Sequence, residues 1–155
     1  MEPLTRRSFV KLAGAGSAAA ATAAAVPFAS RLVGHDGGTL TFRASAGLPS
    51  SPLPSYATHV VEGTVDLVTQ SGTVTSRVLA GHPGGTSGIG LPGLSRIFRI
   101  SEVASEGSRV RLRGLIEDRS QLRRGESPQV EIVLDKGRGV VYAPFLGRQV
   151  ALPVA

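Results

Sequence analysis

An alternation of apolar and polar residues with a period of two constrains the fold of this chain more than any other feature. After His59, Val61 and Val65 share one parity, and Glu62 and Asp66 share the other. Because successive side chains of a strand point to opposite faces, this pattern predicts a strand with one buried and one solvated face. The pattern returns in residues 94–117, 130–135 and 148–154.

Short turns separate these segments, and the number of strands that they connect indicates the fold class. Seven or eight short strands fit into the 155 residues, which is the length of one ordinary domain. Asp118–Gly125 is predicted to form a single helical turn, with Asp118 capping its start and Gly125 its end. The sequence therefore predicts an all-β fold, either a small antiparallel β-barrel or a β-sandwich, since both produce the same alternation.

Two hairpin turns are predicted from glycine. Ser71-Gly72 is expected to join the strand after His59 to the next one, and Glu106-Gly107 is expected to close the hairpin over 94–117. The second turn would place Arg111 opposite Glu102, and Glu117 opposite Arg96. Opposite charges facing each other across two strands help to set the register.

The first 30 residues differ from the rest of the chain. A basic start is followed by 19 uncharged residues, Leu12–Ser30, which are mostly small. Within the start, paired Arg6 and Arg7 are followed by a hydrophobic pair that begins at Phe9, and then by Lys11. This segment resembles a bacterial twin-arginine signal peptide.

The resemblance implies export of the already folded protein by the twin-arginine translocase, which would recognise Arg6, Arg7, Phe9 and Lys11. The product would reach the periplasm, the cell envelope or the medium. Small residues place the expected cleavage after Ala25, or as far downstream as Ala29. A retained signal would act as an anchor, but its weak hydrophobicity argues against a permanent membrane span.

The expected domain organisation follows from these segments. Residues 1–25 are the signal peptide, and 58–155 form the β-domain. Residues 26–57 are rich in Gly, Pro and Ser, which predicts a linker that contains one short strand, Thr39–Arg43.

Two surfaces are candidates for contact with a ligand or partner. Arg96, Arg109, Arg111 and Arg113 are expected on one strand face, where they suit an anionic glycan or an acidic protein partner, although a simply solvated face has the same composition. Residues 81–93 form a Gly-rich loop with Thr86 and Ser87 as possible contacts. It lacks the lysine of a phosphate-binding loop, so a flexible connection is the plainer interpretation. Nucleic acid is not expected, because no row of aromatic residues is present.

A metal site is the alternative from a different functional class. His35, His59 and His82 are the three histidines, and imidazole is a common ligand of zinc and copper. Their spacing favours no local site, and the absence of cysteine excludes thiolate ligands and disulfides.

We therefore expect an exported, non-enzymatic binding or interaction module without a cofactor. The alternatives are an exported metal- or cofactor-binding protein with enzymatic activity, and an accessory subunit of an exported partner.

Overall fold

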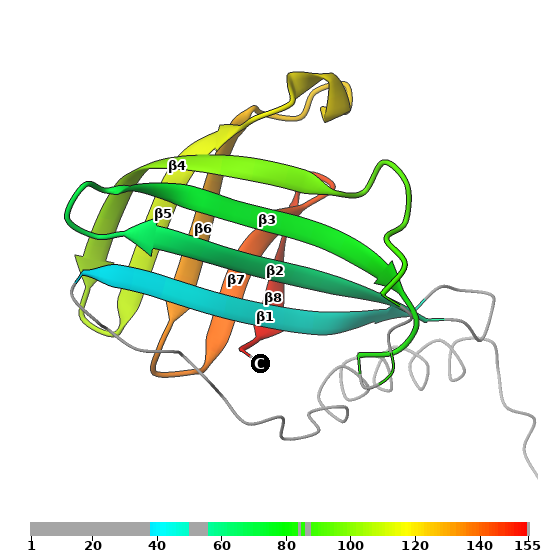
Figure 1. Cartoon of the computed structure of the whole chain (residues 1–155), viewed down its shortest axis with the longest axis horizontal. Helices are drawn as coiled ribbons and strands as arrows, with labels where there is room; N and C mark the ends of the chain where they lie inside the picture. Colours follow the sequence, from blue (N-terminus) through cyan, green and yellow to red (C-terminus); the bar gives the residue numbers. More distant parts are fainter. Residues whose placement is uncertain (1–37, 50–55, 84, 86–87, 155) are drawn as a thin grey trace, which may run out of the picture.

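The computed structural model describes residues 38–49, 56–83, 85 and 88–154, and it is an all-β structure. Eight antiparallel strands form one sheet in which each strand pairs with the next along the chain (Figure 1). The strands are β1 (Thr39–Pro49), β2 (Tyr56–Asp66), β3 (Ser71–Ala80), β4 (Arg96–Glu106), β5 (Arg109–Ile116), β6 (Gln129–Asp135), β7 (Val140–Phe145) and β8 (Arg148–Pro153).

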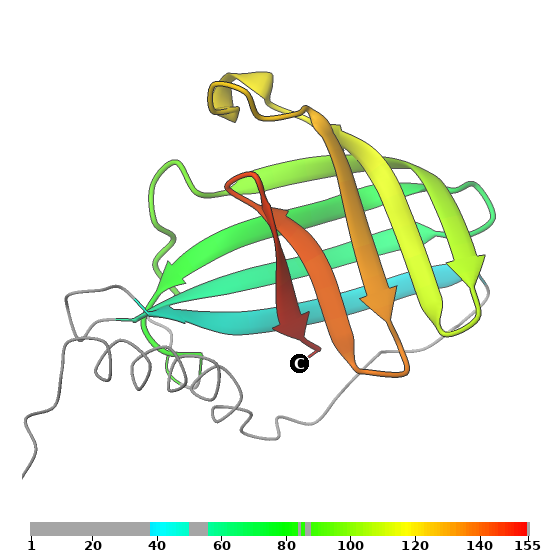
Figure 2. The same ribbon diagram turned by 180° about the vertical axis from the view of Figure 1, so that it is seen from behind.

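The sheet curls into a nearly closed barrel, which settles the choice between barrel and sandwich. β8 returns to lie beside β1, and Ala44 forms a bridge to Val154 (Figure 2). An eight-stranded barrel has an interior just wide enough for side chains to fill. All eight strands contribute buried apolar side chains to the core, among them Phe42, Val65, Val74, Phe98, Leu112, Ile132, Val141 and Leu152.

The first strand corrects the predicted linker. β1 spans 11 residues and pairs with β2 along its whole length, so residues 39–49 and 56–57 belong to the barrel and not to a linker. Its inward residues Leu40, Phe42 and Ala44 are buried. Gly63 lies opposite Phe42, and a Cβ there would come within 3.0 Å of the ring. The glycine thus gives the aromatic side chain its room.

The turn between β2 and β3 lies earlier than predicted. Residues 67–70 form it, and Gly72 is part of β3. The Asp66 carboxylate accepts hydrogen bonds from the backbone amides of Val68 at 2.8 Å and Thr69 at 2.9 Å. An aspartate that binds backbone amides two and three residues ahead builds a turn of its own, which replaces the expected Ser71-Gly72 turn.

The register of the β4–β5 hairpin is also corrected. Its turn is formed by residues 107–108, so Glu102 pairs with Arg113 rather than with Arg111. A β-bulge between Ile100 and Glu102 then shifts the pairing by one residue. Because side chains alternate with a period of two, the bulge puts Arg96 on the inner face although Glu102 lies on the outer face.

The two ends of the barrel differ. One end, the turn end, carries the short connections 67–70, 107–108 and 136–139. The other, the loop end, carries connections 81–95 and 117–128 and the β7–β8 turn. Asp118 caps a 3-10 helix, Arg119–Gln121, as predicted, but the helix ends before Gly125, which adopts a positive φ in a later turn. No helix in the described ranges is long and apolar enough to cross a membrane.

Candidate functional site

The sheet opens between β6 and β7 at the loop end of the barrel. These strands pair only from Val133–Tyr142 to Asp135–Val140, although β6 continues back to Gln129 and β7 continues on to Phe145. Every other pair of consecutive strands pairs over at least five residues. The unpaired halves of β6 and β7 form the two sides of a seam.

Pro144 explains why the ladder stops. Continuing the register by two residues would place Pro144 opposite Glu131, but proline has no amide hydrogen to donate. The Glu131 carbonyl instead accepts a hydrogen bond from the Gln149 side-chain amide at 2.9 Å. Gln149 is the β8 partner of Pro144, so it lies where the missing donor would be. On the β6 side, the Gln129 amide donates to the Ser127 hydroxyl at 3.0 Å.

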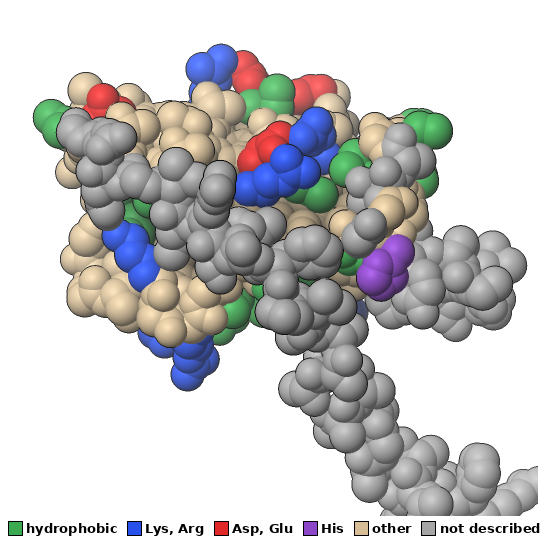
Figure 3. All heavy atoms as spheres, turned by 60° about the horizontal axis from the view of Figure 1, so that its bottom comes forward, with side chains coloured by type: hydrophobic (Ala, Val, Ile, Leu, Met, Phe, Trp, Pro, Cys, Tyr) green, Lys and Arg blue, Asp and Glu red, His purple; other side chains and the backbone are tan. Residues whose placement is uncertain are grey.

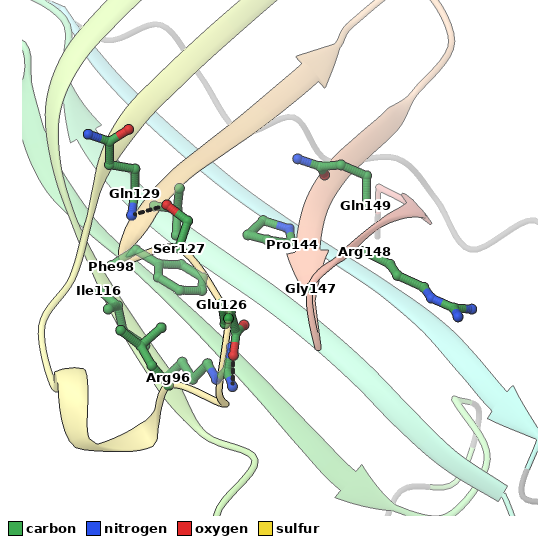
Figure 4. Close-up of a pocket in the computed structure, with 13 residues that line it drawn as sticks. Arg96, Phe98, Ile116, Glu126, Ser127, Gln129, Pro144, Gly147, Arg148 and Gln149 are labelled. Carbon is green, nitrogen blue, oxygen red and sulfur yellow. Dashed lines mark hydrogen bonds and ion pairs between the residues drawn. The ribbon is translucent and has the colours of Figure 1, made fainter.

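The seam holds a cavity of about 340 Å³. Figure 4 shows its two walls: residues 126–129 with the start of β4 on one side, and the β7–β8 hairpin on the other. Buried Phe98, Ile116 and Val130 supply an apolar floor. The polar side chains at the wall are Ser127, Gln129, Arg148 and Gln149, together with an ion pair between Arg96 and Glu126.

Arg96 anchors loop 117–128 to the barrel. Its guanidinium makes a two-pronged ion pair with the Glu126 carboxylate, in which Nη2 lies 3.0 Å from Oε2, and Nη2 also donates to the Gln121 carbonyl at 3.1 Å. The two side chains are only 10% and 11% exposed. The hydrogen bonds from Arg96 lower the pKa of Glu126, and the backbone amide of Arg123 adds to this effect. Arg96 therefore positions a wall of the cavity, and it does not lie on the predicted outer face.

The other three arginines of the predicted face do lie together on the outside of the barrel, but each is ion-paired. Arg109 pairs with Asp135, whereas Arg111 and Arg113 both pair with Glu131. The charges of this arginine face are largely balanced by its own carboxylates, and a role in binding stays a prediction. Figure 3 draws one side of the molecule, on which blue side chains likewise lie directly beside red ones.

The arginines that have no such partner were not among the site residues predicted from the sequence. Eight of the twelve arginines in the described ranges form ion pairs with acidic side chains. The remaining four lie on loop 117–128 or at the start of β8, next to the cavity, and all are exposed: Arg119, Arg123, Arg124 and Arg148. The sequence signal for three of them is the high arginine content of the segment DRSQLRRGE, residues 118–126.

A second polar group lies inside the barrel near the same end. His59 is fully buried, its Nε2 is 2.8 Å from the Ser76 hydroxyl, and its ring lies 4.6 Å from the ring of Phe145. Burial lowers the pKa of His59 to about 4, so the ring is neutral at pH 7. Ser76 is only 3% exposed. A histidine and a serine this deeply buried are packed within the barrel wall and offer no surface to a substrate.

The histidines do not form a metal centre within the described residues. His59 points into the barrel, whereas His82 is exposed on the β3–β4 loop. No group of three or more His, Asp or Glu side chains that could hold a metal ion occurs in the described part of the chain. His35 lies outside that part, as do the signal residues Arg6, Arg7, Phe9 and Lys11.

The Gly-rich loop is partly ordered by pairing. Gly90 bridges to Leu79, the Ala80 amide donates to the Ile89 carbonyl at 2.9 Å, and the Leu91 amide donates to the Val78 carbonyl at 2.8 Å. Residues 89–91 therefore extend the sheet beyond the short β3–β4 ladder, where a simply flexible connection was expected. Thr86 and Ser87 lie outside the described residues.

Comparison with known proteins gives no match: no family model, no curated protein and no solved structure is similar to the chain. The candidate site is therefore defined by its own geometry, a cavity at an opened seam of the barrel with an anchored loop on one side and a hairpin on the other.

Proposed function

We propose that this chain is an exported, non-enzymatic binding protein that takes a small ligand into the cavity between β6 and β7. The observation that carries the proposal is the open seam itself. Pro144 ends the ladder, and Gln149 and Ser127 satisfy backbone groups that the missing pairing leaves behind. An opening whose edges have partners of their own is a stable feature of the fold.

The same partners argue against an added peptide strand as the occupant. Strand addition needs backbone donors and acceptors on the receiving edge. Here Pro144 lacks the donor, the Glu131 carbonyl is already bound by Gln149, and the Gln129 amide is already bound by Ser127. A small molecule does not need that ladder, and a cavity of about 340 Å³ lies in the size range of small-ligand sites.

The lining favours a ligand that is partly apolar and rich in hydrogen-bond acceptors. Phe98, Ile116 and Val130 provide an apolar floor. The Ser127 hydroxyl, the Gln129 side-chain amide and the Arg148 guanidinium are donors at the wall.

The binding test uses 8-anilinonaphthalene-1-sulfonate, an aromatic anion of suitable size, as a probe. We expect one probe per chain in fluorescence titrations. Gln129→Trp places a bulky ring at the wall of the cavity and should weaken binding at least about tenfold, whereas Thr64→Trp on the exposed face of β2 should leave it unchanged. Equal binding by both variants would place the probe elsewhere and refute the proposed site.

Export is tested separately on the signal. Arg6→Lys together with Arg7→Lys should leave the uncleaved precursor in the cytoplasm, because the resemblance to twin-arginine signals rests on this pair. Normal export of the double variant, measured by fractionation and the mass of the product, would refute the twin-arginine route. Retention of the wild-type chain in the cytoplasm would remove the exported part of the proposal.

A further inference from the structure

The unbalanced positive charge of the barrel is concentrated around the cavity. Eight arginines form ion pairs with cross-strand or loop carboxylates, and most of these pairs lie on the outer walls. The four arginines that make no ion pair within the described residues all lie at the loop end. We call them the rim arginines: Arg119, Arg123, Arg124 and Arg148.

One rim arginine lines the cavity, and the loop that carries the other three forms part of the opposite wall. Arg148 begins β8 on the hairpin wall, and Figure 4 shows its side chain extending away from the buried Glu126. The other three belong to loop 117–128, which Arg96 and Glu126 hold against the barrel. The ion pair therefore fixes the position of the loop that carries these three arginines.

The acidic residues of the loop are already occupied. The Asp118 carboxylate accepts from the Ser120 amide at 2.9 Å and from the Ser120 hydroxyl at 2.6 Å. Glu126 is bound by Arg96 and by the Arg123 amide. The third acidic residue of the loop, Glu117, pairs with Arg99 of β4. None of the three carboxylates forms an ion pair with a rim guanidinium. The guanidinium groups of the rim therefore have no direct ion pair with the nearby carboxylates.

We propose that the rim and the cavity together bind an acidic oligosaccharide, with one sugar ring in the cavity and carboxylates of neighbouring rings paired with the rim arginines. This inference rests on the proposed binding function and names its ligand class. Guanidinium groups form two parallel hydrogen bonds with a carboxylate, which makes arginine well suited to this task.

The cavity wall favours a sugar acid over a bare phosphate polymer. Gln129 and Gln149 carry side-chain amides, and Ser127 carries a hydroxyl, beside the apolar floor. A sugar ring has hydroxyls for such groups and an apolar face for such a floor. A phosphate chain has neither, so it would use the rim and leave the cavity lining without a role.

The test measures binding of a hexamer of galacturonic acid to the full-length chain by calorimetry. The rim variant is Arg124→Gln with Arg148→Gln. The wall variant, Arg99→Gln with Arg113→Gln, removes the same charge from exposed ion pairs on β4 and β5. We expect the rim variant to lose about tenfold or more in affinity, because charge-assisted hydrogen bonds are lost, and the wall variant to lose less than about threefold.

Three results would overturn the inference. Equal losses in the rim and wall variants would mean attraction by net charge alone. Binding of maltohexaose, a neutral hexamer, as tight as that of the acidic hexamer would remove the role of charge. Binding of hexametaphosphate but not of the acidic hexamer would assign the rim to phosphate chains.

The naphthalene sulfonate probe separates this inference from the proposed function. If the probe binds in the cavity but the acidic hexamer does not bind, the binding function stands and the ligand class is wrong. If neither the probe nor the acidic hexamer binds, both the proposed binding function and the proposed ligand class are refuted. Loss of hexamer binding in Gln129→Trp, with the rim intact, is the expected sign that a sugar ring enters the cavity.

Discussion

The ion pair between Arg96 and Glu126 is the contact whose loss the structure predicts to be most costly. Its side chains are 10% and 11% exposed, and Glu126 also accepts from the Arg123 amide at 3.0 Å. Glu126→Ala leaves the Arg96 guanidinium buried with the Gln121 carbonyl, at 3.1 Å, as its remaining partner. Removing one partner of a buried pair costs about 3 kcal/mol, because the other charge stays out of water without compensation.

Thermal unfolding measures this loss. For a domain of this size, about 3 kcal/mol corresponds to a fall in Tm of roughly 10 °C. The matched control is Glu117→Ala, which removes the partner of Arg99 from a pair whose side chains are 66% and 41% exposed. Exposed pairs contribute about 0–1 kcal/mol. Equal Tm values for the two variants would refute the argument that Arg96 and Glu126 anchor loop 117–128.

The pH dependence of the same variant gives an independent check. Arg96 lowers the pKa of Glu126 in the folded state, so the unfolded chain takes up this proton first as the pH falls. The stability contributed by the pair is fully present above the ordinary pKa near 4.5 and is lost as the pH falls through the lowered folded value. The stability difference between the wild-type chain and Glu126→Ala should therefore shrink below pH 4.5.

Three further outcomes are expected. Burial lowers the pKa of His59 to about 4, so the unfolded chain binds a proton at His59 more tightly than the folded chain does. The free energy of unfolding should therefore fall by about 3 kcal/mol from pH 6.5 to 4. Urea unfolding of His59→Gln should lack this fall. Gly114→Ala places a Cβ 1.9 Å from a backbone carbonyl of β4 and should cost about 3 kcal/mol, whereas Gly90→Ala meets nothing within 4 Å and should cost less than about 0.5 kcal/mol in the same assay. Gln149→Ala removes the donor to the Glu131 carbonyl, and hydrogen exchange at the seam should accelerate about fivefold while the paired end of β6 is unchanged.

The strands and their inward faces could be predicted from alternation, because burial on one side of a strand leaves a direct record in the sequence. Val130, Ile132 and Leu134 are inward as their spacing predicts. The second half of β1 could not be predicted in this way, since its residues are small. Ala44 is buried and bridges to Val154 next to β8. In the sequence, however, an alanine in a Gly- and Ser-rich stretch is as typical of a linker as of a paired strand.

The register could not be predicted, because a bulge leaves no compositional mark. Glu102 and Arg96 have the same parity, and only the extra residue at the bulge puts them on opposite faces. The candidate site could not be predicted for the same reason. Which arginines lack a carboxylate depends on the strands that face each other, so Arg113 and Arg148 are indistinguishable in the sequence but differ in the fold.

Pro144 is visible in the sequence as a proline within a strand, but its effect on the site depends on closure of the barrel. In an open sheet a proline in a strand can lie at an edge, where no donor is required. In a closed barrel with β7 between β6 and β8, one side of the strand must do without a ladder hydrogen bond. β8 pairs with β7 over all six residues, so the β6 side opens. The cavity thus follows from a missing amide hydrogen rather than from small side chains, and Gln149 supplies the Glu131 carbonyl at the opened edge with a donor.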